Sequence, residues 1–141
     1  LVPYITQSAI GKRKKIKVFG MDYETSDGTP VRDYIHVVDL ANAHVQALYR
    51  LIEKKSKKFY EFFNVGTGKG HSVLEVIKSF EKVNNIKLPY EIVGRREGDI
   101  EKIYSDTNLS RNELDWKAER NLDEMMKSAW KWQKRLKDLG S

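Results

Sequence analysis

The sequence predicts an α/β chain in which short strands alternate with helices. Two short runs, 16–19 and 88–93, contain β-branched and aromatic residues typical of strands. Longer segments carry apolar residues at helical spacing, and two of them begin with polar residues that can cap a helix. The chain has 141 residues, 40% hydrophobic and 33% charged, which is enough for one domain with a core.

In the first half of the chain, a helix is expected over about Val2–Gly11, and a strand over Ile16–Phe19. A polar loop follows over Gly20–Pro30, with Asp27-Gly28 as its turn, and Asp33–His36 is expected to be extended. The next helix is expected over about Val38–Glu53. Its apolar face would comprise Leu40, His44, Ala47, Leu48 and Leu51.

In the second half, Phe59–Val65 reads as a strand that is apolar on both faces and therefore covered on both sides. Ser72 and Glu75 form a capping-box pattern before a helix, and a strand is expected over Leu88–Val93. Helices are expected near Asn108–Leu114 and after the capping pattern Asn121-x-x-Glu124. The last helix would align these apolar residues on one side: Leu122, Met125, Met126, Ala129, Trp132 and Leu136. We interpret Met125, Met126, Trp130 and Trp132 as core packing rather than as a ligand-binding cluster.

Composition excludes several classes of protein. The chain has no cysteine, which rules out disulfides, thiol catalysis and cysteine metal sites, and fits a reducing compartment. No apolar run approaches membrane-spanning length, and no signal-like start is present. The net charge is +6, and the densest basic run is Lys12–Lys15 with Lys17 beyond it. We interpret this run as a solvated turn; a nucleic-acid patch is the alternative. The chain starts at Leu1, without Met, inside a predicted helix, so we expect a piece of a longer protein.

Several motifs fit familiar chemistry only incompletely. Gly66, Gly68 and Gly70 lie between a predicted strand and a helix, but the dinucleotide pattern G-x-G-x-x-G would need its third glycine one residue later. No acidic residue closes the next strand, although Arg95 and Arg96 there could suit NADP. A tight strand-to-helix connection explains the same glycines. No P-loop and no nucleophile elbow are present.

The three histidines do not have metal-ligand spacing. We expect His36 and His44 to form hydrogen bonds within the core.

Arg32, Arg96 and Asp99 form the strongest candidate site. Arginine side chains can hold phosphate oxygens in two-pronged fashion, and a carboxylate can accept hydrogen bonds from ribose hydroxyls. Each arginine could instead form an ordinary ion pair, because Asp33 and Glu97 are their sequence neighbours. Taken together, the residues favour a site for an anion such as a nucleotide diphosphate.

At this point the sequence resembles the C-terminal part of the UDP-glucose 4-epimerase family, within the extended short-chain dehydrogenase/reductase superfamily. The resemblance covers essentially the whole chain in order, and another nucleotide-sugar epimerase or dehydratase of the same superfamily is the alternative. It is carried by these segments: Phe19-Gly20, Asp27–Thr29, Val31–Ala41, Asn64-x-Gly66, Arg95–Asp99, Glu113-Leu114-x-Trp116 and Trp130-x-Trp132-Gln133. The family is cytoplasmic and belongs to galactose metabolism. It interconverts UDP-glucose and UDP-galactose through oxidation and reduction at sugar C4 by a tightly held NAD.

The resemblance implies roles for particular residues. Leu1 would lie beside the sugar nucleotide. Lys17, Val18 and Phe19 would offer backbone groups to uracil, with the Phe19 ring packing on it. Arg32 and Arg96 would hold the pyrophosphate close to Tyr34, Val73 would line the uridine pocket, and Asp99 would bind the ribose. Ile103 replaces a bulky Tyr of some members, which would leave room for the N-acetyl group of UDP-N-acetylhexosamines.

The family's glycine-rich NAD loop, catalytic Ser or Thr and Tyr-x-x-x-Lys are not found in this sequence. The resemblance therefore implies that residues 1–141 are the UDP-sugar-binding portion and that an N-terminal Rossmann domain, absent from this chain, binds NAD. We assign no catalytic, cofactor-binding or metal-binding residue here, and expect the chain alone to be inactive. Neither nucleic acid nor a membrane is an expected partner.

The same resemblance implies that the segment Tyr60–Val65 and the helix after Asp39 complete the Rossmann-type domain. Without that domain, Phe62 and Phe63 would lose cover on one face. We therefore expect a marginally stable monomer or self-association, and a homodimer for the parent enzyme.

Overall fold

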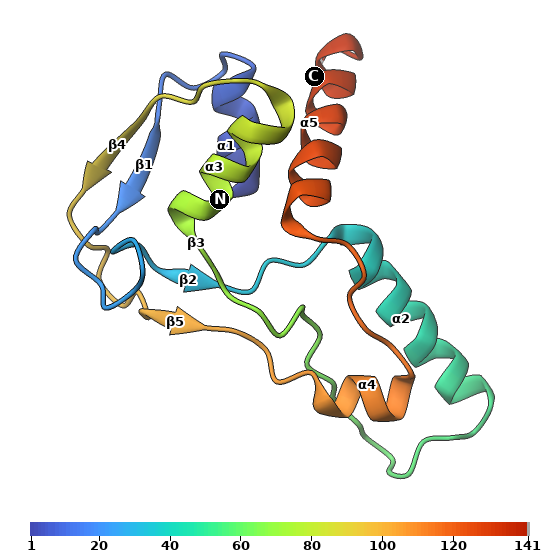
Figure 1. Ribbon diagram of the computed structural model, residues 1–141. Helices are drawn as coiled ribbons and strands as arrows, with labels where there is room; N and C mark the ends of the chain where they lie inside the picture. The colour runs from blue at the N-terminus through green and yellow to red at the C-terminus, as the bar shows by residue number, and fades with distance from the viewer. Residues whose placement is uncertain (141) are drawn as a thin grey trace.

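The computed structural model describes residues 1–140 and confirms the mixed α/β class. Figure 1 shows two groups of elements: β1, β4, α1, α3 and α5 at one end of the molecule, and α2 with α4 at the other. The helices are α1 (Val2–Ala9), α2 (Val37–Ile52), α3 (Val73–Asn84), α4 (Asn108–Leu114) and α5 (Leu122–Asp138). The strands are β1 (Ile16–Phe19), β2 (Val31–Arg32), β3 (His71–Ser72), β4 (Tyr90–Val93) and β5 (Lys102–Ile103).

The strands form two small sheets. β1 pairs in parallel with β4, so that Lys17 lies beside Glu91 and Phe19 beside Val93. In the second sheet β2 is central; it pairs antiparallel with β3 and parallel with β5, which puts Arg32 beside Ile103. The second sheet links the two groups of elements (Figure 1).

The main core lies between β1 and the helices α1, α3 and α5. Its most deeply buried side chains are Ile5, Val18, Val76, Phe80 and Met126. Both predicted capping boxes are present, at Ser72 before α3 and at Asn121 before α5. These caps satisfy backbone N–H groups at each helix start, which explains why both helices begin where the sequence predicts. Within residues 1–140, no helix combines the length and apolar character needed to span a bilayer.

The prediction that Trp132 lies on the buried side of α5 is wrong. Trp130 packs edge-on against Phe80, with ring centroids 5.8 Å apart, whereas Trp132 is 57% exposed. Gln133 takes the buried position instead and accepts a hydrogen bond from the Thr6 hydroxyl at 3.0 Å. A polar side chain is stable there because it finds a partner on α1.

A smaller core cluster, formed by Ala43, Leu114 and Trp116, joins α2 to α4. The Trp116 indole donates to the backbone oxygen of Asp39 at 3.1 Å. The Asp39 carboxylate accepts hydrogen bonds from the backbone N–H groups of Glu119 and Arg120, at 3.1 and 2.9 Å, and from the Arg120 guanidinium. Asp39 therefore holds the 116–120 segment against the start of α2.

The predicted strand Phe59–Val65 is wrong for this structure, because the segment is irregular. No strand within residues 1–140 pairs with it, so its backbone lacks the partners that a sheet requires. Phe59 is fully exposed and Phe62 is 70% exposed. Phe63, in contrast, packs against the Ala43 cluster. Of the two rings expected to lose their cover, only Phe62 is therefore strongly exposed to solvent.

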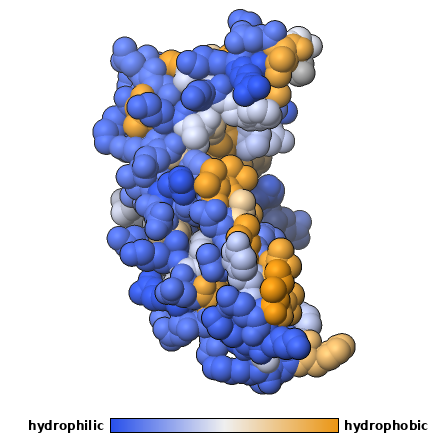
Figure 2. Space-filling model, turned by 90° about the vertical axis from the view of Figure 1, so that its right-hand side faces the viewer, coloured by the Kyte–Doolittle hydropathy of each residue, from blue (hydrophilic) through white to orange (hydrophobic). Residues whose placement is uncertain are grey.

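Much of the predicted apolar face of α2 lies on the surface, although Ala47 packs against the Ala43 cluster. Leu48 and Leu51 are 56% and 64% exposed, and the adjacent side of the helix buries Asp39, Ala43 and Arg50. Arg50 is stabilised there by Glu61 and Glu113, at 2.8 and 3.1 Å. Figure 2 shows apolar side chains gathered in a band on this side of the molecule, over α2. Together with Phe62, this band is an uncovered apolar surface.

The two histidines expected in the core behave differently. His36 is buried; its Nε2 lies 2.8 Å from the Ser128 hydroxyl, and its Nδ1 accepts from the Val38 N–H at the start of α2. That prediction is confirmed. His44 is exposed and only contacts the Leu40 carbonyl of its own helix, so the prediction of a core hydrogen bond is wrong for His44.

Candidate functional site

The predicted site residues surround a cleft of about 700 Å³ beside β1 and β2. Eight of the ten predicted residues line it: Leu1, Lys17, Phe19, Arg32, Tyr34, Val73, Arg96 and Asp99. They come from the start of α1, from β1 and β2, from the start of α3 and from the turn after β4. Residues far apart in the sequence therefore converge on one hollow, which is the size of a small-molecule pocket.

Asp99 joins the two arginines at the centre of this cleft. Its Oδ1 lies 2.9 Å from the Arg96 guanidinium and 3.5 Å from the Arg32 guanidinium. Two cations from separate elements therefore meet within ion-pair distance of one oxygen. This pairing was not predicted: the sequence suggested that Asp99 would face ribose, and that the neighbouring Asp33 or Glu97 would compete for the arginines.

Local geometry explains how the turn brings Arg96 and Asp99 together. Gly98 has a φ of +78°, a conformation that glycine adopts without strain. The Asp99 N–H donates to the Arg96 carbonyl at 3.2 Å and closes the turn, so both side chains leave it in the same direction. The hydrogen bond to Asp99 raises the pKa of Arg96, so its guanidinium remains cationic throughout the physiological range.

Two aromatic residues complete the cleft. Burial raises the pKa of Tyr34 to about 12, although nearby Arg32 lowers it. Tyr34 is therefore a neutral hydrogen-bond donor at pH 7 and is not poised to act as a base. The Arg96 guanidinium lies 5.6 Å from the centre of the Phe19 ring, which is 36% exposed on the outer face of β1. The Phe19 ring is thus available to a flat ligand next to the cationic centre.

Two predicted residues lie outside the cleft lining. The Val18 side chain is fully buried in the main core, so only its backbone could contact a ligand. Ile103 is half exposed on β5, beside Arg32. Its side chain does not contribute to the cleft that this chain forms.

Sequence reasoning missed five residues that also line the cleft: Tyr4, Arg13, Lys15, Ile16 and Pro30. The Arg13 guanidinium stacks over the Tyr4 ring at 4.2 Å and donates to the Gln7 side chain at 2.7 Å. The basic run Lys12–Lys15 was the one sequence feature that could have pointed to Arg13 and Lys15. Its residues are exposed, as a solvated turn requires, but their position at the wall of a cleft depends on how the turn packs.

The glycine-rich loop is occupied by a carboxylate of the chain itself. Asp33 accepts from the Thr67 N–H at 2.9 Å, the Thr67 hydroxyl at 2.6 Å, the Gly68 N–H at 3.0 Å and the Ser105 N–H at 3.2 Å. Burial raises the pKa of Asp33, but these hydrogen bonds outweigh it and lower the pKa below its usual value. A side chain at Gly66 would collide with the same carboxylate. The loop is therefore a packed connection, and its donors do not fit a dinucleotide phosphate.

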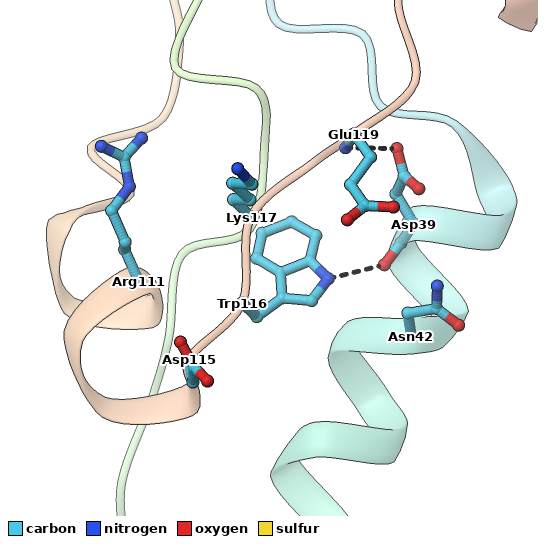
Figure 3. Close-up of a pocket in the computed structure, with 7 residues that line it drawn as sticks. All are labelled: Asp39, Asn42, Arg111, Asp115, Trp116, Lys117 and Glu119. Carbon is cyan, nitrogen blue, oxygen red and sulfur yellow. Dashed lines mark hydrogen bonds between the residues drawn. The ribbon is translucent and has the colours of Figure 1, made fainter.

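A second cavity, of about 310 Å³, lies between α2 and α4. Figure 3 shows Asp39 and Trp116 bonded to each other across it, with the side chains of Arg111, Asp115 and Lys117 spread around the rim. Its most buried polar group, the Asp39 carboxylate, is already satisfied by Glu119 and Arg120. This cavity therefore lies at the edge of the packing contact between α2 and the segment 116–120, and its polar groups have structural roles.

The first cleft gathers cationic, aromatic and hydrogen-bonding groups in one hollow. Two guanidiniums meet at its centre, an aromatic face lies beside them, and Tyr34 offers a neutral donor. Charge-assisted hydrogen bonds from two arginines suit the oxygens of a diphosphate.

Comparisons with known proteins identify the family to which the chain belongs. The protein-family model described as GDP-mannose 4,6 dehydratase matches residues 1–129. A UDP-glucose 4-epimerase of Pasteurella multocida is 56% identical over 135 residues, which are 96% of this chain and 39% of that protein. The chain therefore spans about two fifths of the length of the curated relatives that it matches.

The solved structures that resemble this chain include UDP-glucose 4-epimerases, and the match again covers about two fifths of each. A UDP-glucose-4-epimerase from Stenotrophomonas maltophila, with bound NAD and formylated UDP-arabinopyranose, is 47% identical with a TM-score of 0.93; the match covers 99% of this chain and 40% of that one. A UDP-glucose 4-epimerase from Bifidobacterium longum, in complex with NAD+ and UDP, is 47% identical with a TM-score of 0.88 and coverage of 96% and 39%.

Proposed function

Because the chain belongs to the family described as GDP-mannose 4,6 dehydratase, and matches the C-terminal part of UDP-glucose 4-epimerases at 49–56% identity, we propose that it forms the UDP-sugar-binding part of such an epimerase. The substrates would be UDP-glucose and UDP-galactose, and the whole protein would act in galactose metabolism in the cytoplasm.

The observation that carries this proposal is the meeting of Arg32 and Arg96 at Asp99, with Phe19 and Tyr34 beside them. A diphosphate would take both guanidiniums, the uracil would lie on the Phe19 ring, and Tyr34 would donate a hydrogen bond to the ligand. Asp99 would keep the guanidiniums together in the free protein and accept from the ribose when the ligand is bound. Leu1, Val73 and the backbone of 17–19 would border the nucleoside.

Calorimetric titration tests this proposal directly. UDP, uridine and a single-stranded oligonucleotide are titrated separately into the chain at the same ionic strength. We expect UDP to bind more tightly than uridine, because only UDP reaches the arginines, and the oligonucleotide to bind weakly. An oligonucleotide that binds more tightly than UDP, with steep salt dependence, would instead support a nucleic-acid-binding module.

The chemistry of the whole protein would require NAD, which neighbouring epimerase structures contain. NAD would accept the hydride from sugar C4 and return it, which supplies the oxidation and the reduction. The glycine-rich loop of this chain does not fit NAD, since Asp33 already takes its N–H donors. We therefore assign NAD to an N-terminal domain outside this chain and expect residues 1–141 alone to have no epimerase activity.

The uncovered apolar surface over α2 and Phe62 supports a further part of the same proposal. Leu48, Leu51 and Phe62 are each more than half exposed, and the relatives are more than twice as long as this chain. We expect this surface to pack against the NAD-binding domain in the whole protein. In the isolated chain it would favour self-association.

Ile103 bears on the choice of sugar. It follows Asp99 by four residues and is half exposed next to Arg32, where a sugar attached to the diphosphate could reach it. Because Ile is smaller than Tyr, we expect the whole enzyme to convert UDP-N-acetylglucosamine as well as UDP-glucose. An Ile103→Tyr variant should lose the N-acetylated substrate selectively; equal loss of both activities would contradict this role.

A further inference from the structure

The cleft carries more positive charge than a diphosphate grip needs. Its lining contains five cationic side chains and a single carboxylate, and that carboxylate is shared by Arg32 and Arg96. The remaining three cations, Arg13, Lys15 and Lys17, come from the basic run before and within β1.

These cations extend away from the diphosphate centre in a row. Side chains alternate along a strand, so Lys15, Lys17 and Phe19 point to the same side of the chain at and before β1, and the burial of Ile16 and Val18 on the other side agrees. At about 3.3 Å per residue, the Cα of Lys15 lies roughly 13 Å from that of Phe19. Arg13 lies further along the same wall, where it stacks on Tyr4.

Most of this extra charge is not neutralised by the protein. Lys15 forms an ion pair with Glu91, but within the described part of the chain no carboxylate is paired with Arg13 or Lys17. If a diphosphate is bound at Arg32 and Arg96 and the base lies on Phe19, the side chains of Arg13 and Lys17 lie on the far side of the base from the diphosphate. A ligand with the charge of UDP has no phosphate there to contact them.

Resting on the proposed function, we propose that Arg13 and Lys17 attract the ligand electrostatically at a distance. They raise the affinity of the cleft for nucleoside diphosphates without contacting the phosphates. Coulomb's law gives about a fourfold gain in binding for one cation some 10 Å from a doubly charged diphosphate in water at low ionic strength. Lys17 at this distance would therefore contribute about fourfold, and Arg13, which lies further along the wall, would contribute less, so that the two cations together give about tenfold at most. Such a contribution disappears when salt shortens the Debye length to about 4 Å, near 0.5 M.

The test compares two double variants by calorimetric titration at low salt and at 0.5 M NaCl. The variant R13Q/K17Q removes both charges while keeping side chains of similar reach, and R13K/K17R keeps the charges while changing their shape. A matched control, K127Q/K131Q, removes two exposed charges from α5, away from the cleft. The ligands are UDP and uncharged uridine.

We expect R13Q/K17Q to bind UDP up to about tenfold more weakly than the unmodified chain at low salt, and within twofold of it at 0.5 M NaCl. The loss of UDP affinity in R13Q/K17Q should exceed any change in uridine affinity, R13K/K17R should retain more UDP affinity than R13Q/K17Q, and the control K127Q/K131Q, which lies away from the cleft, should bind UDP within about twofold of the unmodified chain. A loss that persists at high salt, or that is as large for uridine as for UDP, would mean direct contact or structural damage and would overturn the inference. An unchanged UDP affinity at low salt would also overturn it. These results differ from failure of the proposed function, in which the unmodified chain itself would not bind UDP.

Discussion

Substitution of Asp39 by Asn should destabilise the chain by about 3 kcal/mol. The carboxylate is 1% exposed and accepts hydrogen bonds from two backbone N–H groups and from the Arg120 guanidinium. A hydrogen bond to a charged group contributes about 1.5–3 kcal/mol, and breaking a buried ion pair costs about 3–5 kcal/mol. The lower end applies because the Arg120 side chain is 33% exposed and can regain water, and because the Asn oxygen can still accept one N–H.

The effect should also depend on pH with a defined sign. Burial raises the pKa of Asp39, but the hydrogen bonds from Arg120 and Glu119 lower it by more than burial raises it. The net pKa therefore lies below its ordinary 3.8. A lowered folded-state pKa gives stability that is complete above 3.8 and is lost as the pH falls through the folded-state value. The difference between the unmodified chain and Asp39→Asn should therefore be constant from pH 7 to about 5 and shrink below pH 4.

Urea unfolding followed by circular dichroism measures both effects. Asp115→Asn is the matched control: it makes the same change nearby, at an exposed residue with a φ of +48° that Asn tolerates well. We expect the control to stay within about 0.5 kcal/mol of the unmodified chain. A loss below about 1 kcal/mol for Asp39→Asn, or a loss that does not depend on pH, would refute the assigned role.

The remaining predictions concern packing. Trp130→Ala should cost about 2–3 kcal/mol in the free energy of unfolding, because its ring packs against Phe80, whereas Trp132→Ala should change it by less than about 0.5 kcal/mol. Equal costs in urea unfolding would mean that the two rings are wrongly assigned to the core and the surface. The isolated chain should also sediment with a concentration-dependent mass, and Leu48→Lys with Phe62→Ser should reduce that dependence by removing exposed apolar area. A chain that stays monomeric and thermally stable at every concentration would contradict the expectation of self-association.

Local sequence signals predicted much of this fold. α4 spans the expected residues, and α3 and α5 begin directly after the capping residues Ser72 and Asn121. The strands β2, β3 and β5 were missed as strands because each has two residues, which is too short for any periodicity to appear. Their pairing is a tertiary property.

The pattern along α2 identified an apolar face correctly but could not say what covers it. Periodicity reports which side chains are alike, and leaves open whether a partner surface exists. Here much of the apolar face is exposed, and Arg50 is buried because Glu61 and Glu113 pair with it from distant segments. The strand expected over 59–65 failed for the same reason, since no strand among residues 1–140 pairs with it.

The candidate site was predictable in its parts more than in its connections. The residue types and their positions at element ends pointed to Arg32, Arg96 and Asp99, and the structure brings all three into one cleft. That Asp99 binds both arginines, and that Arg13 reaches the same cleft, depends on turn geometry and packing that no local pattern encodes.

Arg32 and Arg96 are proposed to hold a diphosphate, and the affinity of the Arg96→Ala variant for UDP tests this role most directly. Calorimetry should show a loss of about 1.5–3 kcal/mol in binding free energy, the scale of hydrogen bonds to a charged group. The neighbouring Arg95→Ala is the control, because Arg95 is paired with Asp22 and stacked on Tyr23, outside the cleft lining. We predict that Arg95→Ala keeps its UDP affinity within about twofold of the unmodified chain. Unchanged affinity in Arg96→Ala, or equal losses in both variants, would contradict the account.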